Sequence, residues 1–232
     1  MKKPYIKKYG KVSGFKIYLV DGKYIRSNMN EEFTNCGQHY QFKFIPKDEL
    51  WLDREAKKGE KKFYINSMIR IERFLREEMS HENALRKANS YEIAEREKSK
   101  LMKKEIQLKK YPNKLMKSIH KKLLREYSNR HIKIWIVSGE EVRDLFFIDF
   151  TEGGHGYVYN FIPKDEVWID DDLEKSEIKF VLLHELHERR LMKDKKMDYN
   201  TAHFRSSHIE YSCRKNPKML DKKLKKEIEK NK

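Results

Sequence analysis

Four side chains that bind metals or carry protons interrupt one apolar run of the chain. The run is Phe180–Met192 (FVLLHELHERRLM), and it contains His184, Glu185, His187 and Glu188. On a helix of 100° per residue, His184 and Glu188 share the apolar face, so we expect both to be buried. A buried His and Glu one turn apart are costly unless a partner satisfies them, and one metal ion would satisfy both. The pattern predicts a metal site.

A histidine in the next predicted helix completes a ligand set. His203 follows Asp198, an expected N-cap, and an antiparallel return of the chain would bring it to His184. Two histidines and one carboxylate suit a catalytic zinc ion with an open position for water. We therefore predict that His184, Glu188 and His203 bind zinc. Glu185, beside the first ligand, would take the proton from the water as general base.

Three further residues stay open as ligands. Glu210 is an alternative third ligand in place of Glu188. His187 lies roughly 60° around the helix from His184, beside the charged face, where an exposed position is also expected. His155, in the stretch Gly-Gly-His-Gly, is a candidate fourth ligand or substrate-facing group, although a glycine-rich tip commonly forms only a turn.

The helix resembles that of the zincin metallopeptidases, whose HExxH motif supplies two His ligands and a Glu base. Here His184 and Glu185 match the motif, but Glu188 stands where the second His is expected. The resemblance covers one helix and His203, and it implies zinc-dependent hydrolysis with peptides as the favoured substrate. The succession of FIPKDEVWID and HELHERRLM also resembles small uncharacterised proteins of phages and prokaryotes, which implies no activity.

An internal match sets the expected architecture. Phe44–Asp53 (FIPKDELWLD) recurs as Phe161–Asp170 (FIPKDEVWID), an offset of 117 residues (161 minus 44). The offset continues without a gap over the preceding strands and turns and also pairs Arg26 with Arg143. The chain is therefore predicted to be a tandem duplication of one unit.

Each copy reads as an α+β unit, a small antiparallel β-meander followed by a helical hairpin. An alternating strand would end in a hairpin turn at Asp21-Gly22 or Ser138-Gly139, and Ser80 and Asp198 would cap the second helices. The expected divisions are a first repeat at 1–96, a charged helical linker at 97–130, a second repeat at 131–215 and a basic tail at 216–232. The lysine-rich stretch from Arg214 to Lys232 is expected to form a frayed helix or a disordered arm that binds anions. The linker reads as a charged helix to Lys110, then an amphipathic helix over 115–127.

The two copies differ at the candidate ligands. With the first helices aligned at an offset of 116, His184 matches Met68, and Glu188 matches Glu72. At an offset of 118, His203 matches Leu85. His155 matches Gln38 at the offset of 117. Loss of the histidines together in the first copy predicts a site in the second copy and a degenerate site in the first.

Composition sets further expectations. The 232 residues carry 53 Lys and Arg against 37 Asp and Glu, a formal charge of +16. This excess favours nucleic acid as a partner through the lysine-rich linker and tail, although lysines interleaved with glutamates also decorate ordinary solvated surfaces. The second hypothesis is accordingly a non-enzymatic nucleic-acid-binding or assembly protein of viral type, in which the His and Glu residues form a buried network or hold a structural metal.

The remaining signals concern location. Cys36 and Cys213 are isolated, so neither a disulfide framework nor a CxxC metal motif is expected. No apolar run approaches the ~18–20 residues that span a bilayer, and the N-terminal residues lack the apolar segment of a signal peptide. The sequence predicts no membrane contact and a cytoplasmic protein, or one of the virion or host cytoplasm if it is viral.

Overall fold

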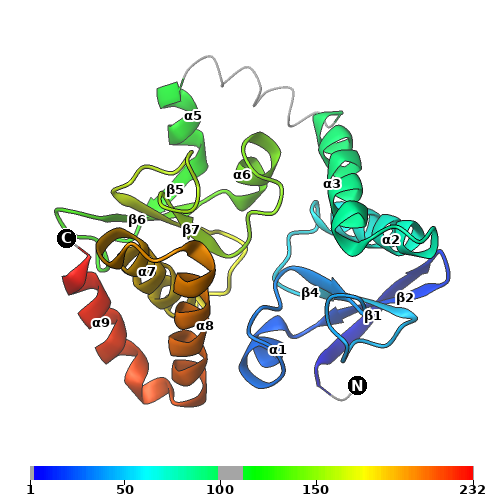
Figure 1. Cartoon of the computed structure of the whole chain (residues 1–232), viewed down its shortest axis with the longest axis horizontal. Coiled ribbons are helices and arrows are strands. Elements are labelled where there is room, and N and C mark those ends of the chain that lie inside the picture. Colours follow the sequence, from blue (N-terminus) through cyan, green and yellow to red (C-terminus); the bar gives the residue numbers. More distant parts are fainter. Residues whose placement is uncertain (1–2, 99–111, 232) are drawn as a thin grey trace. The chain divides into compact units, whose positions relative to one another are not determined.

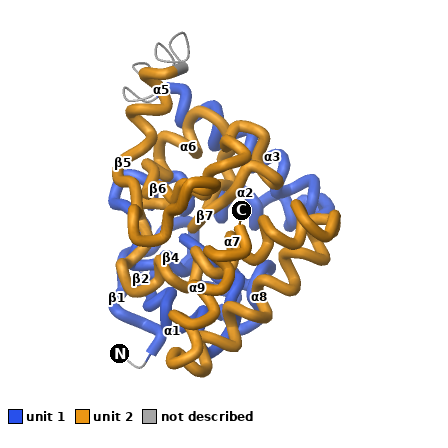
Figure 2. Tube along the Cα trace, turned by 90° about the vertical axis from the view of Figure 1, so that its left-hand side faces the viewer, with its two compact units in different colours: residues 1–110 blue, residues 111–232 orange. Residues whose placement is uncertain are grey.

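The computed structural model describes residues 3–98 and 112–231, and it divides the chain into two compact units. Unit 1 comprises residues 1–110 and unit 2 residues 111–232 (Figure 2). Both combine helices with a four-stranded sheet, so the fold is mixed α+β (Figure 1). None of the described helices has the length and apolar content needed to cross a membrane.

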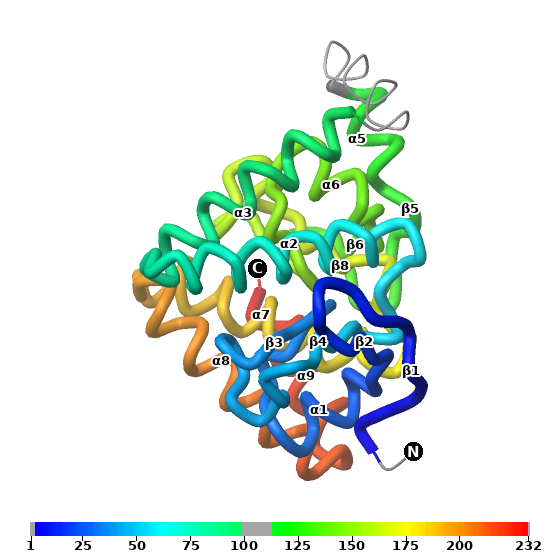
Figure 3. The backbone as a smooth tube through the Cα atoms, turned by 90° about the vertical axis from the view of Figure 1, so that its right-hand side faces the viewer, coloured from blue at the N-terminus to red at the C-terminus, as the bar shows by residue number. Residues whose placement is uncertain are grey.

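Unit 1 carries its strands and helices in the order β-β-α-β-β-α-α. They are β1 (Tyr5–Val12), β2 (Phe15–Val20), α1 (Gly22–Asn28), β3 (Cys36–Gln38), β4 (Glu49–Asp53), α2 (Lys61–Arg76) and α3 (His81–Glu97). The sheet order is β1-β2-β4-β3, with β2 and β4 parallel and the other pairs antiparallel. Helices α2 and α3 pack side by side (Figure 3).

Unit 2 has the same order of elements, preceded by one helix and followed by two. They are α5 (Pro112–Ile119), β5 (His120–Leu123), β6 (Lys133–Val137), α6 (Gly139–Leu145), β7 (Gly153–His155), β8 (Glu166–Asp170), α7 (Ile178–Lys195), α8 (Tyr199–Lys215), the 3-10 helix η1 (Pro217–Met219) and α9 (Leu220–Lys230). The sheet order is β5-β6-β8-β7, with β6 and β8 parallel. Helix α7 packs against β7, β8, α8 and α9, so it is the central helix of this unit.

The sheets are mixed, so the expected antiparallel meander is wrong. Parallel pairing aligns Ile17 with Leu50 in unit 1 and Ile134 with Val167 in unit 2. A parallel pair needs a crossover connection, which here contains α1 or α6 and the short strand β3 or β7. Strand patterns in the sequence locate the strands, but the choice of partner depends on contacts between residues about 30 apart, which local periodicity does not encode.

Helices α1 and α6 begin at the two places where the sequence predicted hairpin turns, so that prediction is wrong. Asp21 and Ser138 are N-caps, whose side chains accept from the backbone N–H of Tyr24 and Glu141. The glycines that follow are required by close packing: a Cβ on Gly22 would lie 1.6 Å from Asp53 Oδ2. A pair such as Asp-Gly or Ser-Gly is compatible with a hairpin turn and also with the N-terminus of a capped helix. The sequence alone therefore did not distinguish the two structures.

Each crossover is tied to its sheet by a buried arginine. Arg26 pairs with Asp53 at 2.9 Å, and Arg143 pairs with Asp170 at 2.6 Å. Arg143 also pairs with Asp172, at 3.2 Å, and Asp171 accepts from the backbone N–H of Gly139 at 3.3 Å. The arginine that the sequence comparison paired at the offset of 117 therefore anchors the crossover in both units.

Several predicted elements have other bounds. The helix expected over 115–127 ends at Ile119, and the chain continues as strand β5, an edge of the second sheet. The predicted charged helix to Lys110 is described only as far as Glu97, since residues 99–111 lie outside the described part. The expected caps Ser80 and Asp198 are confirmed, each accepting from a backbone N–H in the first turn.

The basic tail is an ordered helix, which corrects the expected frayed or disordered arm. Leu220 and Leu224 of α9 are buried in the core of unit 2. The Arg190 guanidinium of α7 donates to Glu227 at 2.6 Å, and Arg189 donates to Asn231 at 2.8 Å. The lysines of α9 occupy one side of an amphipathic helix, and its leucines anchor the other side.

Candidate metal centre

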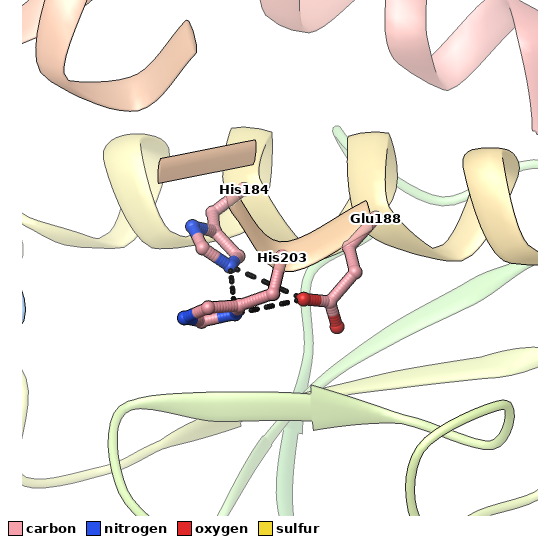
Figure 4. Close-up of side chains that lie close together, drawn as sticks. All are labelled: His184, Glu188 and His203. Atoms are coloured by element: carbon pink, nitrogen blue, oxygen red, sulfur yellow. Dashed lines mark hydrogen bonds and ion pairs between the residues drawn. The ribbon is translucent and has the colours of Figure 1, made fainter. Parts of the chain in front are cut away.

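Helices α7 and α8 bring His184, Glu188 and His203 together, as the spacing predicted (Figure 4). His184 Nε2 lies 3.1 Å from His203 Nδ1 and 3.5 Å from Glu188 Oε2. His203 Nδ1 lies 2.9 Å from the same carboxylate oxygen. His184 and Glu188 are one turn apart on the buried face of α7, and His203 faces them from α8.

The triangle of these three atoms has the size of one face of a zinc tetrahedron. With bonds of about 2.0–2.1 Å, two ligand atoms of tetrahedral zinc lie about 3.3–3.4 Å apart. The three distances, 2.9, 3.1 and 3.5 Å, bracket that value. The His203 side chain is 32% exposed, so the cluster reaches solvent on this side. The chemistry of two imidazoles and a carboxylate fits a divalent metal with one position open.

A buried chain of charges orients His184. Its Nδ1 lies 3.0 Å from Glu210 Oε2, and Arg214 holds the other Glu210 oxygen at 2.9 Å. Arg214 is held in turn by Glu177 at 2.7 Å. Burial would raise the pKa of Glu210, but His184 and Arg214 lower it to about 2, so Glu210 is ionised and accepts the Nδ1–H. The Nε2 of His184 therefore faces the cluster, and Glu210 lies behind the ring.

The charges around His184 also determine its protonation. Burial would lower the pKa of this imidazole, but hydrogen bonds to Glu188 and Glu210 raise it well above its ordinary value. Two carboxylates thus stabilise a positive charge at this place. A metal ion bound at Nε2 would meet the same negative surroundings in place of the proton.

His155 orients Glu188 from the opposite side. The backbone N–H of Tyr157 donates to His155 Nδ1 at 3.2 Å, so the ring carries its proton on Nε2 and donates it to Glu188 Oε1 at 3.1 Å. Burial lowers the pKa of His155, which keeps the ring neutral. Burial alone would raise the pKa of Glu188, but hydrogen bonds from His155, His184 and His203 lower it strongly. His155 thus lies behind Glu188 and presents no lone pair to the cluster.

Glu185 lies next to the ligand triangle with the properties of an acid–base group. One of its carboxylate oxygens lies within 4.8 Å of a ring nitrogen of His155 and of a carboxylate oxygen of Glu188. Burial and the nearby Glu188 charge raise its pKa to about 8. Gly153 makes room for it, since a Cβ there would lie 3.2 Å from Glu185 Cγ. A carboxyl group with a pKa near neutrality can both accept and return a proton.

His187 lies apart from the cluster. Its Nδ1 lies 3.3 Å from Glu227 Oε1 of α9 and 3.2 Å from an Arg190 nitrogen. Its position at the α7–α9 interface makes it part of a packing contact rather than of the ligand set.

Sequence reasoning missed the groups that support the ligands. Arg214, Glu177 and Gly153 were not singled out, although Arg214 donates to Glu210, Glu177 accepts from Arg214, and Gly153 lies against Glu185. One signal was present: a Glu and an Arg four residues apart occur in both second helices, as Glu210–Arg214 and Glu92–Arg96. In unit 1 this pair forms the same buried chain, with Arg96 donating to Glu92 and to Glu60.

These shared contacts align α2 with α7 at an offset of 117, which corrects the offset of 116. Glu60 and Glu177 directly precede the helices and accept from the arginines. The guanidinium groups lie over Phe63 at 4.3 Å and Phe180 at 4.6 Å, and both phenylalanines obey the offset of 117.

The corrected offset changes the comparison of the two units. Ser67, which bonds Glu92, takes the place of His184, and the buried Ile71 takes the place of Glu188. The counterpart of Glu185 is Met68. Gln38, in the place of His155, is buried, and neither of its side-chain polar atoms has a hydrogen-bond partner among the described residues. At these described positions unit 1 therefore has none of the candidate ligands, including the carboxylate.

Comparison of the chain with models of protein families, with curated proteins and with solved structures gave no match.

Proposed function

We propose that unit 2 binds one divalent metal ion, best fitted by zinc, through His184, Glu188 and His203. We further propose that this centre hydrolyses an acyl bond, with peptide bonds the favoured substrate. The observation that carries the proposal is the triangle of ligand atoms with sides of 2.9–3.5 Å. The Glu210 carboxylate behind His184 supports it, because such partners orient metal-binding imidazoles.

The chain supplies the groups that hydrolysis needs. A bound zinc ion would polarise a carbonyl oxygen and make a bound water more acidic. Glu185, next to His184, would take the proton of that water as general base and pass it to the leaving group. The partly exposed side at His203 gives a substrate access. The order of ligand, base and second ligand at 184, 185 and 188 supports the resemblance to zincins.

Metal content and turnover test the proposal separately. The purified protein is expected to contain one equivalent of zinc by elemental analysis. His184→Ala should remove the metal, whereas Glu185→Gln should keep it and abolish hydrolysis of a mixed peptide library. His208→Ala, an exposed histidine on α8, is the matched control and should change neither result. A protein that neither contains nor binds zinc would overturn the assignment.

Chelation separates a catalytic from a structural metal. Removal of zinc from a catalytic site should leave thermal unfolding cooperative, because α7 is also held by the sheet and by α9. A structural site predicts loss of cooperativity with chelator.

We also propose that the two units arose by duplication of one gene segment. Support comes from the repeated decapeptide, the equal strand orders and the equivalent charged chains Glu60–Arg96–Glu92 and Glu177–Arg214–Glu210. On this proposal unit 1 kept the scaffold and lost the ligands. Gln38 is buried without a hydrogen-bond partner among the described residues, which fits such a history, since it stands where a histidine is hydrogen-bonded in unit 2.

Rebuilding the site tests the duplication. The three candidate ligands are introduced on α2 and α3 by Ser67→His, Ile71→Glu and Leu85→His. Gln38→His adds the imidazole that would orient the carboxylate introduced by Ile71→Glu. The combined variant should bind a second equivalent of zinc, while one without Ile71→Glu should keep the original stoichiometry. If the combined variant folds but binds only one equivalent of zinc, the scaffolds of the two units are not equivalent and the duplication proposal is contradicted.

A second candidate function, nucleic-acid binding, is favoured by the charge of unit 1. Residues 1–110 contain 27 Lys and Arg against 16 Asp and Glu, whereas residues 111–232 contain 26 against 21. Edge strand β1 exposes Lys7, Lys8 and Lys11 and has no acidic residue. Salt-dependent RNA or DNA binding that survives His184→Ala would support this function.

A further inference from the structure

A cavity of about 440 Å³ in unit 2 is lined by residues of β5, β6, β8 and the start of α7. Its apolar walls are formed by Leu124, Tyr127, Ile136, Leu173 and Ile178. All but Leu124 are half-buried, so the walls reach solvent. None of the candidate metal ligands is among the described residues that line it. A cavity of this size with apolar walls is typical of sites that hold a small ligand or a side chain.

Unit 1 buries a lysine side chain at the equivalent place. At the offset of 117, Ile178 matches Lys61, and Leu173 matches Ala56. Lys61 is only 8% exposed, and its ammonium group donates to the carbonyl oxygen of Ala56. A lysine is rarely so buried unless its charged group has a partner. The scaffold that the two units share therefore accommodates an alkylammonium group here, and in unit 1 that group belongs to the chain itself.

The walls around this place are closed in unit 1 and open in unit 2. Leu19 and Ala56 are buried, whereas their counterparts Ile136 and Leu173 are half-buried and line the cavity. Ile178 has neither the long stem nor the ammonium group of a lysine. Unit 2 therefore has a cavity where unit 1 has a buried lysine side chain.

The charges at this place differ between the units in the direction that favours a cationic ligand in unit 2. Asp171 lines the cavity and matches Arg54 of unit 1. Together with the exchange of Lys61 for Ile178, two positions that carry two positive charges in unit 1 carry one negative charge in unit 2. Asp171 accepts from the backbone N–H of Gly139 at 3.3 Å, and a carboxylate can accept further hydrogen bonds. A cation in the cavity would be attracted to this carboxylate.

The other charged groups at the cavity are compatible with an ammonium group there. Glu126 adds a negative charge, and Asp170 is paired with Arg143 at 2.6 Å. The three lysines that line the cavity match exposed lysines of unit 1, pairing Lys122 with Lys7, Lys175 with Lys58 and Lys179 with Lys62. Unit 1 thus holds the ammonium group of Lys61 in the presence of the same three lysines, whose long stems let their own charges stay in water.

We propose that this cavity binds a primary alkylammonium group, supplied by a lysine side chain of a peptide or by a small aliphatic amine. The alkyl chain would lie against Ile136 and Ile178. The ammonium group would donate to the Asp171 carboxylate and to the Leu173 carbonyl oxygen, which matches the carbonyl that Lys61 binds in unit 1. The site is separate from the proposed metal centre, so binding of the amine should persist when zinc is removed.

Three probes with the same chain and different charges test the site: 1-pentylamine, 1-pentanol and pentanoate. Their affinities are measured by NMR titration, following the methyl groups of Ile136 and Ile178. We expect the amine to bind at least tenfold more tightly than the alcohol, and pentanoate to bind most weakly. Asp171→Asn should remove the preference for the amine and leave the affinity for the alcohol unchanged. Asp194→Asn, an exposed aspartate near the end of α7, is the control and should keep the preference.

Unit 1 also supplies a variant that fills the cavity. Leu173→Ala combined with Ile178→Lys reproduces the pair Ala56 and Lys61. Its own lysine should occupy the cavity, so the amine should no longer bind, while cooperative thermal unfolding is kept. N-acetyl-lysine methylamide identifies the source of the group: binding as tight as that of the amine indicates a lysine of a peptide, and binding of the free amine alone indicates a small amine.

Three results would overturn the proposal. Equal binding of the amine and the alcohol would show that the cavity does not recognise the charge. Tighter binding of pentanoate than of the amine would show that Lys122 and Lys175 select an anion instead. Binding of the amine by a folded Leu173→Ala, Ile178→Lys variant would place the amine elsewhere. If that variant does not fold, the Asp171→Asn titration decides, since unchanged preference for the amine in that variant also contradicts the site.

Discussion

Glu210→Gln is expected to weaken zinc binding although Glu210 is not a ligand. Glu210 accepts from His184 Nδ1 with one oxygen and from Arg214 with the other, at 3.0 and 2.9 Å. A glutamine offers only one acceptor oxygen. Because Arg214 is always charged and can only donate, that oxygen should face Arg214 and the amide NH2 should face His184.

The imidazole would then have to change tautomer. Its Nδ1 would accept from the amide, and the proton would move to Nε2, the atom that faces the ligand cluster. Loss of an outer partner of a metal-binding histidine typically costs 10–100-fold in affinity, or about 1.4–2.7 kcal/mol. The forced tautomer places this variant near the upper end of that range.

Unit 1 supplies the matched control for this experiment. Glu92 bonds Arg96 as Glu210 bonds Arg214, but it meets the hydroxyl of Ser67 instead of an imidazole. Glu92→Gln should therefore cost about the same stability, roughly 1–3 kcal/mol for a buried charge-assisted bond, and leave zinc affinity unchanged. Zinc affinity is measured by competition with a chelator, and stability by thermal unfolding. A Glu210→Gln affinity within twofold of the wild type, or an equal loss in Glu92→Gln, would refute the reasoning.

Two further predictions concern the surroundings of α7. Gly153→Ala places a Cβ 3.0 Å from the Trp168 carbonyl oxygen, 3.1 Å from Val181 Cγ1 and 3.2 Å from Glu185 Cγ, so turnover should fall about tenfold or more while zinc stoichiometry is kept; unchanged turnover would show that Glu185 is not positioned by this contact. Burial would raise the pKa of Glu227, but His187 and Arg190 lower it from 4.5 to about 2. The resulting stabilisation of roughly 1–2 kcal/mol is complete above pH 4.5 and is lost as the pH falls toward 2. Glu227→Gln should therefore destabilise the protein at pH 7 and have little effect near pH 2. Urea unfolding at both pH values measures the difference.

The sequence by itself determined the parts that depend on local spacing. His184 and Glu188 share the buried face of α7 because helical periodicity is fixed by backbone geometry. Ser80 and Asp198 cap their helices because a short polar side chain satisfies a free backbone N–H wherever it precedes a helix.

Only the tertiary structure decided the parts that depend on partners distant in the chain. The parallel pairing of β2 with β4, the packing of α9 on α7 and the position of His155 behind Glu188 each join residues about 30 or more apart. The arrangement of the candidate site was decided in the same way: Glu210 and His155 contact His184 and Glu188 from outside the triangle of candidate ligand atoms, because ring orientation follows from the group that each imidazole nitrogen meets. Spacing brings candidate ligands to one face of a helix, whereas packing from all sides decides which atom of each side chain faces the centre.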